Sequence, residues 1–212
     1  MVRCFLIHSV CPVSVLSAGD TRVLYSRVFG PDEAVLCEQH RELSSEDRRL
    51  LQKEKISVVA RYSGCHCQDH TWRQVWSAVS LSREASGRLL VDPAPGQEAA
   101  AVQDADSGVM RLRAGDPFTG ETVVLWLGVH SLAFTLVCEP HENLLLAEGT
   151  LRNLSQHCLE SLHMLGPGSE VLLKSSRIDV LLSRLLPHGQ LLFLNHRFTQ
   201  SLEKDVASFL LK

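Results

Sequence analysis

The sequence predicts an α+β fold in which most of the strands precede most of the helices. The start of the chain has the period-two pattern of an extended segment, whereas leucines recur with a period near 3.6 in the last third. The chain has 212 residues, of which 45% are hydrophobic and 21% charged. This length and composition suit one hydrophobic core, so we expect a single domain over residues 1–212.

Several segments carry the pattern of antiparallel strands. In residues 2–7, Val2, Cys4 and Leu6 alternate with Arg3, Phe5 and Ile7, as in a strand. Residues 21–29 are rich in β-branched and aromatic side chains, so these two segments are expected to pair as a hairpin. Short apolar runs separated by turn residues then predict a three-stranded meander at 109–113, 121–127 and 131–138. We interpret residues 143–147 as one more short strand at its end.

Helical signals lie on both sides of the meander. Ser44 and Asp47 have the spacing of a capping box at the start of a charged helix that reaches about residue 61. A short helix is expected at 72–81, followed by a mobile loop at about 86–107 that is rich in small residues, with a Pro-Ala-Pro-Gly break at 93–96.

Three helices are expected in the last third of the chain. The first presents one apolar face and ends at a Gly-Pro-Gly sequence, 166–168. The second opens at Ser176 with Asp179 in a capping-box relation and stops at 187–189, and the third begins near Thr199. The first two faces consist of Leu151, Leu154, Cys158, Leu162 and Leu165, and of Ile178, Leu181, Leu182 and Leu185.

Charge and cysteine content exclude some classes of protein. The net charge of −3 argues against binding to nucleic acid, and no apolar run is long enough to cross a membrane. Seven cysteines without regular spacing indicate a reducing compartment. Residues 1–18 loosely resemble a secretory signal, but His8 and Pro12 interrupt the apolar stretch, so we interpret the segment as a strand.

Catalytic and metal-binding motifs are largely missing from the sequence. There is no nucleophile elbow, Walker loop or dinucleotide-binding glycine motif. His141 and Glu142 begin like a zinc-protease motif, but Leu145 stands where the second histidine is required. Residues 65–70 (CHCQDH) crowd thiols and imidazoles together without a second ligand cluster, so we interpret them as a surface segment. We predict no catalytic residue, no cofactor and no metal.

The order of elements and several sequence strings resemble the small (sigma) subunits of the heterotetrameric vesicle-coat adaptor complexes. Residues 1–8 (MVRCFLIH), 129–134 (VHSLAF) and 171–194 are similar to stretches of that family. The branch found in adaptor protein complex five is most similar, through the strings RVLYSRVFG (22–30), VLWLG (124–128), HENLLLAEGTLR (141–152) and LPHGQLLFLN (186–195). This resemblance implies a longin-like domain, with a five-stranded antiparallel sheet and helices packed on both faces.

The same resemblance implies a non-catalytic role. A sigma subunit of this branch is expected to bind and stabilise the large zeta subunit, with beta and mu subunits completing the complex, and to associate through the complex with spatacsin and spastizin. The implied location is the cytoplasm, peripheral on late endosomes and lysosomes, in vesicle-mediated protein transport. In some relatives a hydrophobic slot holds acidic dileucine signals, and the resemblance places Leu132 and Leu154 near such a slot.

The residues themselves leave alternatives open. The leucine doublets 185–186, 191–192 and 210–211 exceed what one stripe per helix requires, which indicates an interaction surface. A free-standing longin-type regulator of a small GTPase or of membrane-fusion machinery is a second hypothesis. An enzyme with Cys158 activated by a nearby histidine is a third.

Overall fold

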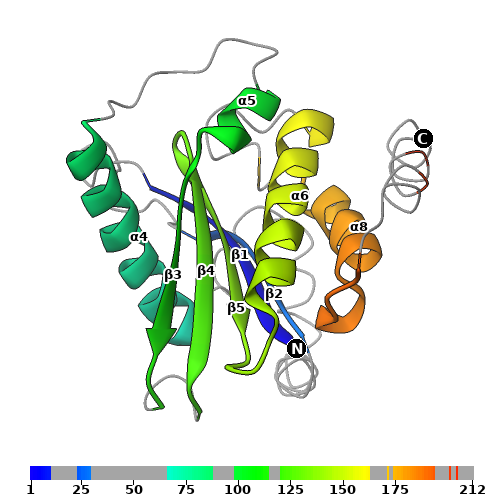
Figure 1. Ribbon diagram of the computed structural model, residues 1–212. Coiled ribbons are helices and arrows are strands. Elements are labelled where there is room, and N and C mark those ends of the chain that lie inside the picture. The colour runs from blue at the N-terminus through cyan, green and yellow to red at the C-terminus, as the bar shows by residue number, and fades with distance from the viewer. Residues whose placement is uncertain are drawn as a thin grey trace, which may run out of the picture.

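The computed structural model describes residues 1–10, 23–29, 66–87, 98–114, 120–162, 171 and 174–193, with the single positions 201 and 204. Its centre is a five-stranded antiparallel sheet with the strand order β2-β1-β5-β4-β3 (Figure 1). The strands are β1 (Val2–Ser9), β2 (Val23–Val28), β3 (Asp106–Leu112), β4 (Thr122–Val129) and β5 (Leu132–Cys138). The predicted sheet is therefore confirmed, including the antiparallel pairing of the first two strands.

Helices cover both faces of this sheet, as expected (Figure 1). One face lies under α4 (His66–Ser86), whose Val75 and Val79 pack in a cluster with Val124 and Trp126 of β4. The helices of the other face are α6 (Leu144–Leu162) and α8 (Ser175–Leu185), followed by a short 3-10 turn, η2 (Pro187–Gly189). A short helix, α5 (Glu98–Gln103), contacts α6 beside the sheet.

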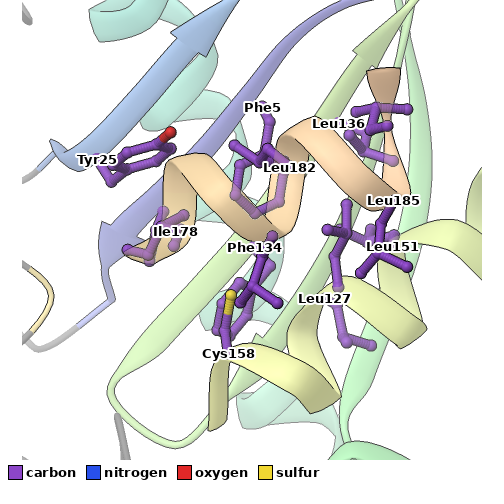
Figure 2. Close-up of a cluster of buried hydrophobic side chains, with 14 of the residues drawn as sticks. Phe5, Tyr25, Leu127, Phe134, Leu136, Leu151, Cys158, Ile178, Leu182 and Leu185 are labelled. Atoms are coloured by element: carbon purple, nitrogen blue, oxygen red, sulfur yellow. The ribbon is translucent and has the colours of Figure 1, made fainter. Parts of the chain in front are cut away.

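The larger hydrophobic cluster lies between the sheet and the pair α6 and α8. Figure 2 shows side chains from both layers meeting there, with Phe134 of β5 between Cys158 of α6 and Leu182 of α8. The predicted face of α8 is confirmed, because Ile178, Leu181, Leu182 and Leu185 are all buried. Each of these large side chains removes apolar surface from water, which is worth about 1.5–3 kcal/mol per fully buried residue.

Position in the sheet explains the sequence pattern of each strand. Every residue of β4 and β5 is buried, because both strands have a strand on either side and helices over both faces. β3 instead alternates between half-buried and exposed residues, as a strand at the rim does. The burial patterns of β4, β5 and β3 therefore reflect two central positions and one outer position in the sheet.

The strand predicted at 143–147 is wrong, because α6 begins there. The side-chain oxygen of Asn143 accepts a hydrogen bond from the backbone N–H of Leu146 at 3.1 Å, and its carbonyl accepts one from Ala147 at 2.9 Å. Asn143 thus caps the helix and satisfies an amide that has no partner within the helix. Three successive leucines have no periodicity of their own, so the sequence reads equally well as strand or helix.

Other predicted boundaries also need correction. α4 runs well beyond the 72–81 expected for it, and the loop predicted at 86–107 contains α5 and the start of β3. The N-cap of α8 is Lys174 and no side chain caps it, so the capping box predicted at Ser176 is wrong. The helix predicted at 44–61 lies outside the described residues, and so does nearly all of the one expected from Thr199.

Candidate functional site

Residues singled out for chemistry do not form a reaction centre in the part of the chain that the structure describes. Within those ranges no group of three or more His, Cys, Asp or Glu side chains is placed to hold a metal ion. Cys65 and the side chains of residues 66–70 lie outside the described set, so the interpretation of that segment remains a prediction.

Cys158, the thiol considered as a nucleophile, lies in the hydrophobic core. Its side chain is fully buried among the apolar residues between α6 and the sheet (Figure 2). Burial raises the pKa of this thiol to about 12, because an apolar surrounding disfavours the thiolate. A nucleophilic cysteine requires the opposite, an accessible sulfur with a lowered pKa, so this environment is that of a structural cysteine.

His141 and Glu142 lie in the turn between β5 and α6. The carboxylate of Glu142 forms an ion pair with the amino group of Met1, and the carboxylate of Glu139 lies 3.2 Å from the same amino nitrogen. The two glutamates therefore hold the start of β1 against the end of β5, where Val2 pairs with Cys138. This is a structural role.

The two leucines expected near a dileucine slot belong to the core. Leu132 at the start of β5 and Leu154 in the middle of α6 are both buried in the larger hydrophobic cluster. Their side chains are covered by the chain itself, so they do not form an exposed surface for a peptide.

The leucine doublets that predicted an interaction surface are not the most exposed apolar residues of the described chain. Leu185 and Leu186 are both buried, whereas Leu191 and Leu192 are half-buried and the third doublet lies outside the described residues. Both residues of the first doublet turn inward because the helix ends at Leu186 and the chain enters η2. That doublet therefore does not contribute to an interaction surface.

Two other large apolar side chains are exposed on segments that adjoin the β5–α6 turn and η2. Leu145, in the first turn of α6, is 83% exposed, and Phe193, just after η2, is 86% exposed. The turn before α6 bonds to Met1, and η2 contacts β1 at Val2, so both segments lie beside the N-terminal end of β1. We call Leu145 and Phe193, with the half-buried Leu191 and Leu192 between η2 and Phe193, the apolar end.

The apolar end is the candidate interaction site of this chain. Leaving such side chains in water forgoes about 1.5–3 kcal/mol each, and grouped exposed apolar residues commonly mark a protein–protein contact. The sequence contained a signal that was missed: three leucines in a row at 144–146 on a helix cannot all face one core. No helix in the described part of the chain has the length and apolar character that a membrane crossing requires.

The fold and this site define a class of protein. A five-stranded antiparallel sheet with helices on both faces is the longin-like architecture of adaptor-complex small subunits. Comparison with known families agrees, because the family described as AP-5 complex subunit sigma-1 matches residues 1–207. The chain belongs to this family.

Two curated relatives show how much of the chain is shared. The chain is 44% identical over 210 residues to the human protein named AP-5 complex subunit sigma-1, an alignment that covers 98% of each chain. It is 40% identical over 169 residues to the mouse protein of the same name, covering 79% of this chain and 91% of the relative.

Proposed function

We propose that this chain acts as a non-catalytic small subunit that binds and stabilises the large zeta subunit of an adaptor complex in endosomal and lysosomal protein transport. The family match over residues 1–207 is the observation that carries the proposal, since it spans every described element. The beta and mu subunits would complete the complex. Spatacsin and spastizin are its proposed partners through that complex, and the chain is proposed to be cytoplasmic and peripheral on late endosome and lysosome membranes.

The apolar end is the proposed contact with the zeta subunit. Leu145 and Phe193 project from two separate segments, so one partner surface that covers both would join the start of α6 to the segment after η2. A permanent subunit interface is more apolar than a transient one, which fits leucine and phenylalanine as anchors.

Co-expression with the trunk of the zeta subunit, followed by size-exclusion chromatography, tests both parts of the proposal. A stable one-to-one peak is expected, and Leu145→Glu combined with Phe193→Glu is expected to abolish it. Leu81→Glu is the matched control, because Leu81 is 63% exposed but lies on α4, and it should leave the peak unchanged.

Each part has its own contradicting result. If the unmodified chain elutes as a soluble monomer and does not bind the zeta subunit, the subunit proposal is wrong. The hypothesis of a free-standing regulator then gains support. If the peak forms but survives the double substitution, the subunit proposal stands and the apolar end is the wrong surface. Binding of a hydrophobic dye to the isolated chain should fall with the same double substitution.

A further inference from the structure

The outer edge of the sheet at β3 has the properties of a docking site for an extended peptide. Among the residues that the structure describes, β4 is the one strand that pairs with β3, which leaves the opposite side of its backbone without a strand neighbour (Figure 1). Backbone amide and carbonyl groups along such an edge can pair with an added strand.

β3 lacks several of the features that usually protect an edge strand. Its register with β4 is unbroken over seven residue pairs, from Asp106 to Leu112, and it contains neither proline nor lysine. The pairing of β1 with β2, at the other side of the sheet, is interrupted by an irregularity between Ile7 and His8. Tyr25 and Arg27 of β2 also bond to Asp179 of α8. The contacts of β3 with helices lie at its start, where the carboxylate of Asp106 is 3.8 Å from the guanidinium of Arg83 and Ser107 bonds to Arg152. Natural sheets usually carry features that prevent another chain from pairing with their edge strands. The regular, uninterrupted edge strand β3 therefore calls for an explanation.

The two faces of β3 have different chemistry. On the face covered by α4, Met110 and Leu112 are half-buried and pack against the hydrophobic cluster that contains Val79 and Trp126. On the α6 face, Arg152 bonds to Ser107 at 3.2 Å, and beyond this contact Val109 is 53% exposed. The exposed residues that follow on this face are Arg111, whose guanidinium lies 3.6 Å from the carboxylate of Glu121, and Arg113.

We propose that β3 binds an extended peptide segment of a partner protein, in which acidic and apolar residues alternate, as a sixth strand of the sheet. Successive side chains of a strand point to opposite faces. The apolar residues would therefore pack beside Met110 and Leu112 under α4, while the acidic residues face Arg111 and Arg113. This inference concerns a second surface and does not depend on the binding of the zeta subunit.

The probe is a labelled, end-capped seven-residue peptide, Glu-Val-Glu-Val-Glu-Val-Glu, titrated against the full chain by fluorescence anisotropy. Binding is expected, with slowed amide hydrogen exchange in β3. The same peptide with lysine in place of glutamate, and one with proline at its centre, should each bind at least tenfold more weakly. The first change reverses the charge, and the second removes a backbone donor.

Variants of the chain then assign the site. Arg111→Glu with Arg113→Glu is expected to weaken binding at least tenfold, at little cost in stability because both side chains are exposed. Arg73→Glu with Arg177→Glu is the matched control, since both are exposed arginines on α4 and α8 and the change in net charge is the same. The control should bind like the unmodified chain.

Several results would overturn the inference. These are no binding, equal weakening by the control pair, or equal binding of the proline peptide. If the β3 amides that point away from β4 are already protected without peptide, the chain's own residues occupy the edge. A dimer that dissociates only in the Arg111 and Arg113 variant would mean that a second copy does.

Discussion

Replacing Gly189 by alanine should destabilise this protein because two costs meet at that residue. Gly189 ends η2 with φ of +75°, a left-handed conformation that favours glycine. A Cβ placed there would collide with the backbone carbonyl of Val2 in β1 and would lie 2.8 Å from the Cβ of Phe29. Neither obstacle is the flexible end of a side chain, so no rotamer change relieves the contact.

The size of the effect follows from these two costs. A non-glycine residue in the left-handed conformation costs about 1–2 kcal/mol. Forcing extra atoms into a packed site costs about 1–3 kcal/mol more. We therefore expect Gly189→Ala to lower the free energy of unfolding by about 2–5 kcal/mol.

Two other glycines separate the costs in the same assay, denaturant unfolding of the full chain. Gly87 also has a positive φ, +63°, but has open space around it, so Gly87→Ala should show the conformational cost of about 1–2 kcal/mol alone. Gly149 lies inside α6 with nothing near it, so Gly149→Ala should stabilise the protein by about 0.5–1 kcal/mol. If Gly189→Ala costs no more than Gly87→Ala, the close approach of η2 to β1 is not as described.

Three further predictions concern single side chains. Asn143→Ala should lower the free energy of unfolding by about 1 kcal/mol through loss of the α6 cap, whereas Asn143→Asp should retain most of it. Cys158 should react with a thiol reagent at pH 8 only after denaturant is added, since its pKa is about 12; fast labelling of the folded chain would contradict its burial. Burial lowers the pKa of His8 to about 3, so the unfolded state binds the proton more tightly and stability falls as the pH drops below about 6.5. Between pH 7 and 5 this loss should be about 2 kcal/mol, and His8→Gln should lack it; an equal acid sensitivity in that variant would refute the assignment.

Periodicity predicted elements well where one face of the element meets the core. Leu151, Leu154 and Cys158 recur at helical spacing and are all buried. The central strands β4 and β5 were predicted from their short apolar runs. The same reasoning failed at residues 143–147, because an unbroken run of leucines fits a buried strand as well as a helix. The Asn143 cap decides between them, and a single asparagine is a weak signal without the structure.

The amino-acid sequence was sufficient for the α+β class, the antiparallel meander and the family resemblance, since these depend on local periodicity and on strings of neighbouring residues. It did not reveal which apolar side chains remain exposed. That depends on contacts between distant segments: Leu185 and Leu186 are buried between α8 and the sheet, while Leu145 and Phe193 stay exposed. The edge position of β3 among the described strands likewise depends on the strand order, which is set by pairing between segments far apart in the sequence.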